Sequence, residues 1–143
     1  MGTPFQIDAD SGVLTFAQVP LKLVPRQTLS SFLATDVGAR ARDGGSNDRW
    51  QRYHLRQHLE DGRVLGVSFF FLDGLLERVS FGYLPEDEAD WSTWSQEKEL
   101  ARAEDFRGEI VRQLGRQGRF PWGSADAGYD GKAAAAHLWV TYD

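Results

Sequence analysis

The 143-residue chain contains no cysteine. Disulfide bonds, thiol nucleophiles, iron–sulfur clusters and cysteine zinc sites are therefore all excluded. Histidine is scarce as well, because His54, His58 and His137 are the only three. A nucleophilic triad with a histidine base would have to use one of these residues, and no G-x-S-x-G motif accompanies them.

Glycine-rich phosphate loops and long apolar runs are also missing. Neither G-x-x-x-x-G-K nor G-x-G-x-x-G occurs, so nothing in the sequence favours nucleotide binding. No apolar run approaches the roughly 18 residues of a membrane span, and no signal peptide is visible at the N-terminus. His54 and His58 would lie roughly 13 Å apart on one strand, too far to share an ion. We expect a soluble cytoplasmic protein without a metal, another cofactor or a membrane partner.

The composition favours one folded domain spanning residues 1–143. Apolar residues make up 41% of the chain and aromatic residues 13%, which supplies one continuous core. The formal net charge of −5 opposes a general role in coating nucleic acid, which needs a basic footprint. We therefore expect no nucleic-acid partner.

The middle third of the chain predicts a three-stranded antiparallel meander. Residues 50–60, 63–72 and 75–84 alternate in polarity and are separated by Asp61-Gly62 and Asp73-Gly74. An Asp-Gly pair between alternating runs is a strong hairpin signal, because both turn residues take positive φ. The residues expected to face the core are Leu65, Val67, Phe69 and Phe71 on the second strand and Leu75, Val79, Phe81 and Tyr83 on the third.

Residues 91–117 predict a long amphipathic helix that covers the apolar face of the meander. Thr93 and Gln96 form a candidate capping box, and Gly115 follows the last apolar position as a stop. The apolar positions at helical spacing are Leu100, Ala103, Phe106, Ile110 and Leu114.

The remaining segments predict shorter elements. We expect a hairpin around the DADSG turn, a short helix capped by Thr28, a mobile loop over 36–49 and an irregular segment from Phe120 to Lys132. The chain should end in a strand with Leu138, Val140 and Tyr142 on one side. The predicted fold class is α+β: a two-layer arrangement of an antiparallel sheet of about five or six strands, with one long and one short helix on one face.

A basic stripe runs along the first strand of the meander. Arg52, His54, Arg56 and His58 occupy every second position, so all four point away from the core. Antiparallel sheets routinely keep one face wet, which explains such a stripe without any function. Arginine and aromatic residues are also enriched in protein interfaces, which favours a binding surface. The candidate partner-binding residues are Arg52, His54, Arg56, Arg78 and Trp139.

An alternative function is small-molecule binding or an unrecognised enzymatic activity. Its site would be an aromatic pocket formed by Trp91, Trp94, Trp122 and Tyr129 with Asp130. The same aromatic residues would equally serve as structural residues of the core. The sequence leaves these two interpretations open, and it points to no particular catalytic residue.

Several short segments resemble a group of small bacterial proteins of uncharacterised function. The resemblance rests on FQID, TLSSFLAT, LLERVSF, DWSTWSQEKE, FPWG, YDGK and WVTYD, and its most specific parts are Trp94, Ser95 and Glu99 and the pairs Trp122-Gly123 and Tyr129-Asp130 with Lys132. It implies no catalytic residue. The size, acidity and layout also resemble those of toxin-immunity proteins, which block an enzyme by covering its active site. Together these features predict a non-catalytic, protein-binding or accessory protein, whose oligomeric state stays open.

Overall fold

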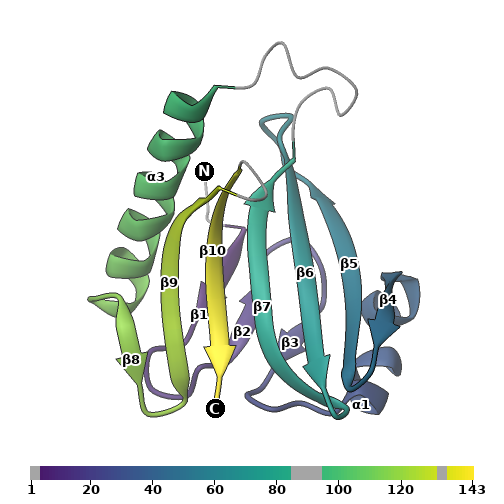
Figure 1. Cartoon of the computed structure of the whole chain (residues 1–143). Helices are drawn as coiled ribbons and strands as arrows, with labels where there is room; N and C mark the ends of the chain where they lie inside the picture. The colour runs from purple at the N-terminus through teal and green to yellow at the C-terminus, as the bar shows by residue number, and fades with distance from the viewer. Residues whose placement is uncertain (1–3, 85–94, 132–134) are drawn as a thin grey trace.

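The computed structural model describes residues 4–84, 95–131 and 135–143. It is an α+β fold built on a seven-stranded antiparallel sheet in the order β4-β5-β6-β7-β10-β9-β8, with a three-stranded antiparallel sheet β1-β2-β3 beside it (Figure 1). The small sheet comprises β1 (Phe5–Ile7), β2 (Leu14–Phe16) and β3 (Lys22–Leu23). The large sheet comprises β4 (Arg42–Asn47), β5 (Trp50–His58), β6 (Val64–Leu72), β7 (Leu75–Tyr83), β8 (Gly118–Phe120), β9 (Gly123–Asp130) and β10 (Ala135–Tyr142). The helices are α1 (Leu29–Leu33), α2 (Asp36–Arg40) and α3 (Gln96–Leu114).

The predicted meander is confirmed as β5, β6 and β7, but its two turns differ. Asp73 and Gly74 both have positive φ, 53° and 78°, which is the geometry of a two-residue type I′ turn. In the other turn only Gly62 has positive φ, and the backbone N–H of Leu59 donates to the carbonyl of Arg63. The β5–β6 hairpin therefore closes through a longer turn than predicted.

The alternation of buried and outward side chains is confirmed on β6 and interrupted on β7. Phe70 pairs with Arg78 whereas Phe71 pairs with Leu76, so Glu77 is an extra residue in a β-bulge. The bulge reverses the alternation at the start of β7. Leu76 is fully buried and Leu75 is not, so the prediction that Leu75 faces the core is wrong.

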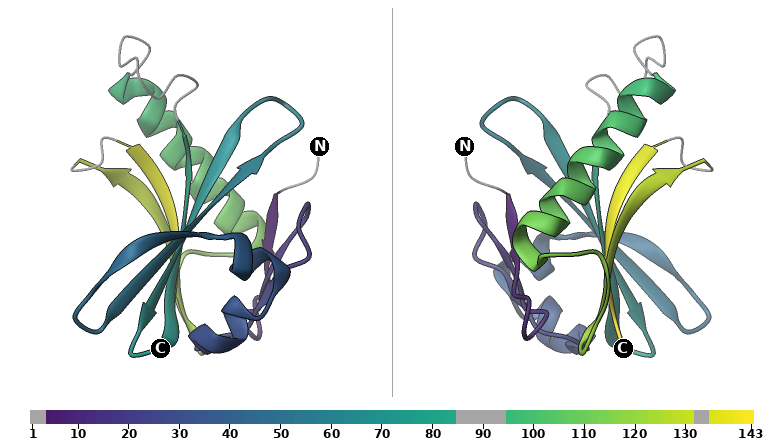
Figure 2. Two further views of the ribbon diagram at one scale, coloured as in Figure 1. Left: turned by 90° about the vertical axis from the view of Figure 1, so that its right-hand side faces the viewer. Right: turned by 90° about the vertical axis from the view of Figure 1, so that its left-hand side faces the viewer.

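The inner face of the large sheet is covered by two different units. Helix α3 lies against β9 and β10, while β1–β3 and α1 lie behind the meander (Figures 1 and 2). The ring of Phe5 stacks on Phe81 with centroids 4.1 Å apart, and Phe32 of α1 lies 4.9 Å from Phe69. The long helix therefore does not cover the whole meander as predicted. These aromatic contacts from the N-terminal third cover most of it instead.

Helix α3 begins and ends at residues with clear capping geometry. The hydroxyl of Ser95 accepts a hydrogen bond from the backbone N–H of Lys98, so Ser95 is the N-cap. The predicted capping box from Thr93 is therefore wrong, and Thr93 itself lies outside the described residues. Gly115 ends the helix in the left-handed conformation as predicted, with φ of 85°. Leu100 is 47% exposed, so its predicted place in the apolar stripe is wrong, and Glu99 is buried beside it.

Two segments that were predicted to be irregular are ordered. The predicted loop over 36–49 contains α2 and β4, and the Thr35 hydroxyl caps α2 by accepting from the Gly38 N–H. The segment after Phe120 contains β9, whose Ala125 and Ala127 are buried. Alanine has low strand propensity, so pairing with β10 rather than intrinsic preference holds β9.

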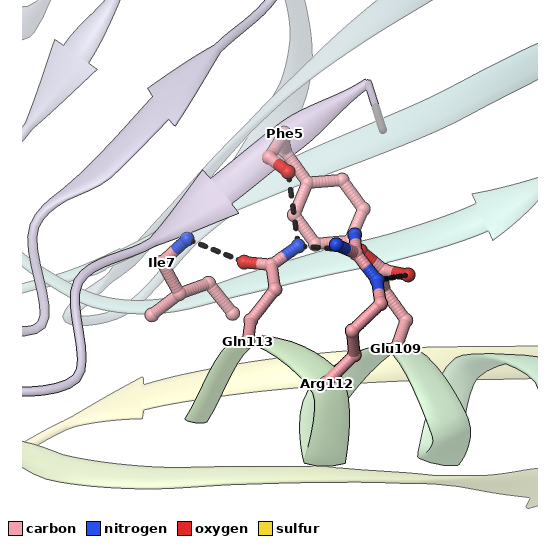
Figure 3. Close-up of polar contacts among 5 residues, drawn as sticks. All are labelled: Phe5, Ile7, Glu109, Arg112 and Gln113. Atoms are coloured by element: carbon pink, nitrogen blue, oxygen red, sulfur yellow. Dashed lines mark hydrogen bonds and ion pairs between the residues drawn. The ribbon is translucent and has the colours of Figure 1, made fainter. Parts of the chain in front are cut away.

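Gln113 of α3 fastens the small sheet to the long helix (Figure 3). Its Oε1 accepts a 2.7 Å hydrogen bond from the Ile7 N–H, and its Nε2 donates to the Phe5 carbonyl at 3.1 Å. These are two of the backbone groups that β1, an edge strand, presents on its unpaired side. Nε2 also donates to Glu109, so the amide is held on its own helix as well.

Candidate functional site

One face of the seven-stranded sheet is not covered by any described helix or by β1–β3 (Figures 1 and 2). We call it the open face, and it is formed by the even-numbered residues of β5, β6, β9 and the second half of β7, the odd-numbered residues of β10, and Arg42 of β4. The strand register places His54, Ser68, Ser80 and Trp139 in one row across four strands. Neighbouring strands lie roughly 4.8 Å apart, so His54 and Trp139 are separated by about 14 Å.

A second row runs next to the first and carries two arginines. Arg52 of β5 pairs with Phe70 of β6, which pairs with Arg78 of β7. Arg56 lies on the other side of His54 on β5, where it pairs with Gly66. The structure therefore brings all five candidate partner-binding residues onto the open face, which follows from the alternation of strand side chains.

The open-face arginines differ from most other arginines in their pairing. Six arginines form salt bridges within the described residues: Arg49, Arg63, Arg102, Arg107, Arg112 and Arg119. Arg42, Arg52 and Arg78 are exposed and make no salt bridge to any residue in the described ranges. Within residues 4–84, 95–131 and 135–143, Arg52 donates one long hydrogen bond of 3.5 Å, to the Gly44 carbonyl. Three guanidinium groups on one side of the molecule are thus available to a partner.

His54 is held between two neighbours on the open face. Its Nδ1 lies 2.8 Å from the Ser68 hydroxyl oxygen, and a Cβ added to Gly44 would lie 2.3 Å from its Nε2. Burial lowers the pKa of His54, and the positive charges of Arg52 and Arg42 lower it further. The imidazole is therefore neutral at pH 7 in the free protein.

A hollow of about 780 Å³ lies beside His54 at the β4 end of the open face. This volume is within the range of sites that hold small molecules. The polar side chains that line it are Arg40, Arg42, Asp43, His54, Arg56 and Ser68. Leu84 forms an apolar wall next to Gly66, where an added Cβ would lie 3.2 Å from the Leu84 Cδ2.

The other end of the open face is aromatic and acidic. Trp139 is half-buried beside Gly128, and His137 lies over Gly82, where an added Cβ would lie 2.8 Å from its Cδ2. Burial lowers the pKa of His137, while the negative charges of Asp130 and Glu99 act in the opposite direction. Asp126 pairs with Trp139 from β9. The open face therefore changes from cationic at β4 and β5 to acidic at β9.

The structure does not assemble the alternative aromatic pocket from its described members. Trp122 is 8% exposed, stacks on Phe120 and donates its indole N–H to the Ala9 carbonyl at 3.0 Å. Gly123, the residue after Trp122, begins β9. Tyr129 lies six residues further along this strand, roughly 20 Å away by strand rise, so Tyr129 is far from Trp122. Asp130 points to the face opposite Tyr129 because successive strand residues alternate. Trp91 and Trp94 lie outside the described residues.

Sequence reasoning missed Arg40, Arg42 and Gly44 because all three lie in the segment that was predicted to be a loop. The alternating pattern Ala39-Arg40-Ala41-Arg42 was the available signal. It did not identify a site on its own, because the two arginines become neighbours of His54 only once β4 pairs with β5.

Glu99 is one of the residues on which the resemblance to small bacterial proteins rests, and its contacts in the structure connect a helix to a strand. Its carboxylate is buried and accepts a 2.9 Å hydrogen bond from the Ala136 N–H of β10. The pairing between β10 and β7 ends at Leu138 and Phe81, so Glu99 satisfies a backbone group beyond the ladder. Arg102 pairs with the same carboxylate at 2.9 Å. Glu99 therefore joins α3 to the sheet.

Clusters that could bind a metal ion are absent from the described parts of the chain. No group of three or more histidine, aspartate or glutamate side chains there is arranged to hold a metal ion. Among the described helices, none combines the length and the apolar character that a membrane span needs. Comparison with protein families, with curated proteins and with solved structures gave no match for this chain.

Proposed function

We propose that this protein binds another protein through the open face of its large sheet, and that the bound surface is predominantly acidic. The observation that carries the proposal is that three exposed arginines of the open face, Arg42, Arg52 and Arg78, make no salt bridge to the described parts of the chain, whose net charge is −5. Arginine is suited to this role because its planar guanidinium binds carboxylates through two parallel hydrogen bonds.

The size of the open face is compatible with a protein interface. Five strands spaced about 4.8 Å apart, each about 30 Å long, cover roughly 700 Å². A standard interface buries about 800 Å² on each partner. Trp139 supplies a large half-buried aromatic side chain on this surface, and tryptophan and arginine are the residue types most enriched among energetically dominant contacts.

The distribution of charge favours a protein over a nucleic acid. Asp126 and Asp130 lie on the β9 side of the open face, opposite the arginines of β4 and β5. A polyanion would be repelled by this acidic side, whereas a folded partner can match both signs. An immunity-type role, in which the partner is an enzyme whose active site is covered, is one form of this proposal.

The test compares two variants that change the charge equally. Arg52→Glu/Arg78→Glu reverses two open-face arginines, and Lys22→Glu/Arg26→Glu reverses two exposed cations in and after β3, in the layer behind the sheet. A partner is first isolated with the wild-type protein and purified, and its Kd is then measured for each variant by calorimetry. We expect R52E/R78E to weaken binding by about 100-fold or more, since each lost charged contact costs about 1.5–3 kcal/mol.

The control variant K22E/R26E should bind within about twofold of wild type at the same salt concentration. Equal weakening by both variants would mean that only the overall charge matters, and the open face would not be the interface. Unchanged binding of R52E/R78E would also overturn the proposal, as would isolation of a nucleic acid as the partner.

A further inference from the structure

The hollow at the β4 end of the open face has the charge of a site for a small dianion. Among its described lining residues, Arg40, Arg42 and Arg56 are cationic and Asp43 is the one carboxylate. With His54 neutral, the formal charges of these side chains sum to plus two, without counting the partner that Arg56 itself has. We propose that this hollow binds a phosphate-type oxyanion, the terminal phosphate of a phosphomonoester, and that this binding needs no protein partner, although Arg42 belongs to both surfaces.

The arginines come from separate elements that line the same hollow. Arg40 ends α2, where its Nε donates to the Asp36 carbonyl at 3.1 Å. Arg42 begins β4 and pairs directly with His54 of β5, and Arg56 lies two residues further along β5. Guanidinium groups approaching from a helix end and two strands can contact different oxygens of one tetrahedral anion, which is how arginine clusters recognise phosphate.

The backbone of β4 next to His54 helps to keep the imidazole in the wall of the hollow. The register of β4 against β5 shifts between Asp43 and Gly45, which makes Gly44 the extra residue of a β-bulge. Glycine lets β4 approach here without displacing the imidazole, because a Cβ on Gly44 would meet the His54 Nε2 at 2.3 Å. The Ser68 hydroxyl holds the other ring nitrogen at 2.8 Å. His54 therefore lines the hollow in one orientation.

Phosphate rather than a single carboxylate is favoured by the charge balance and by the histidine. Burial and the positive charges of Arg52 and Arg42 oppose the protonation of His54. The other charged side chains that line the hollow are Arg40, Arg56 and Asp43. A bound dianion would offset the repulsion and raise the pKa of His54. Affinity for phosphate should then increase as the pH falls from 7.5 to 6, because the protonated imidazole adds a charged donor.

The probe in the experiment is inorganic phosphate, added to the full chain while the His54 imidazole is followed by NMR. Chloride and acetate at matched ionic strength are the reference anions. We expect a saturable shift of the His54 signals with phosphate, and at least fivefold weaker effects with the two monovalent anions. An increase of the His54 pKa on saturation with phosphate is the second expected result.

Two variants distinguish a built site from general attraction to a basic surface. Arg40→Gln/Arg42→Gln removes two hollow arginines, and Arg78→Gln removes an open-face arginine outside the hollow. R40Q/R42Q should weaken phosphate binding by at least about tenfold, the effect of losing one charged hydrogen bond, and R78Q should leave it within twofold. If R40Q/R42Q fails to fold, R42Q alone serves as the test with the same direction of change.

Absence of a saturable shift would overturn the inference, as would equal responses to phosphate and chloride or equal weakening by R40Q/R42Q and R78Q. The source of the phosphate is decided by a second titration with phosphoserine and with a phosphoserine peptide. Tighter binding of the peptide would assign the hollow to a phosphorylated protein, and equal binding would assign it to free phosphomonoesters. The phosphate titration uses no protein partner. A negative result would therefore overturn the phosphate site without deciding whether the open face binds an acidic protein.

Discussion

The Nδ1 of His54 lies 2.8 Å from the Oγ of Ser68, across the β5–β6 pair and on the open face. A hydrogen bond between paired strand residues fixes the side chain of each. It also leaves the opposite ring nitrogen of His54 toward Gly44 of β4. The position of the central histidine of the candidate site is therefore decided by its cross-strand neighbour and by a glycine at the sheet edge.

Replacing Ser68 with alanine should reduce stability by about 1 kcal/mol, the net contribution of one half-buried hydrogen bond. Ser80 provides a matched control, because it pairs directly with Ser68 on the same face and has no side-chain hydrogen bond within the described residues. Urea unfolding of S68A and S80A measures both effects. An S80A loss as large as that of S68A would show that the hydroxyl contact with His54 contributes nothing specific.

Replacing Gly44 with alanine should cost about 1–3 kcal/mol, because the new Cβ would overlap the His54 Nε2. The double variant Gly44→Ala/His54→Ala removes the atom that is overlapped. A double-mutant cycle from urea unfolding should therefore show favourable coupling of at least about 0.5 kcal/mol. Additive losses would mean that the cost of G44A arises from the backbone of the β4 bulge and not from His54.

The meander and its open face could be predicted from the sequence because alternation and Asp-Gly turns are local signals. The β-bulge at Glu77 could not be predicted, since one extra residue looks like a single interruption of the pattern. The strands β4 and β9 were missed for another reason. Their glycines, alanines and charged residues have low strand propensity, and only pairing with β5 and β10 makes them strands.

The part of the candidate site that lies on β5 could be predicted from the sequence, whereas the hollow could not. Arg52, His54 and Arg56 share a face through the two-residue period of a strand, which the sequence displays directly. The hollow depends on Arg40 and Arg42, whose approach to His54 is a tertiary consequence of α2, β4 and the Gly44 bulge. Local patterns carry no information about such an approach. The separation of Trp122 from Tyr129 follows from the extended backbone of β9, which its alanines and glycines do not predict.

Stability should decrease as the pH falls from 7 toward 5. The pKa values of His54 and His137 are both lowered, in each case chiefly by burial. Between the ordinary histidine pKa near 6.5 and the lowered values, the unfolded chain binds more protons than the folded chain, so the free energy of unfolding rises with pH across that window. Above the ordinary pKa both states are neutral, and the effect disappears.

The measurement is urea unfolding at pH 7 and pH 5 for wild type and for His54→Gln/His137→Gln. The double variant lacks both titrating rings, so its stability should change less between the two pH values. A loss on acidification as large as that of wild type would assign the pH dependence to other groups. Comparing each protein with itself at two pH values separates this effect from any constant destabilisation by the substitutions.

Gln113 should be a main attachment of the small sheet to α3. Gln113→Ala removes the amide that accepts from Ile7 and donates to Phe5, so β1 loses both partners on its outer edge. We expect a loss of about 1–3 kcal/mol, because the buried side of β1 cannot exchange these bonds fully for water. Gln96→Ala is the control, since Gln96 is exposed on the same helix.

Hydrogen exchange identifies where the loss of Gln113 acts. The amide of Ile7 should exchange much faster in Q113A than in wild type, while amides of β6, such as that of Val67, keep their relative order of protection. Uniformly faster exchange throughout the sheet would mean that Gln113 supports the whole fold and not one attachment. Unchanged exchange at Ile7 would mean that the stacking of Phe5 on Phe81 holds β1 without the amide.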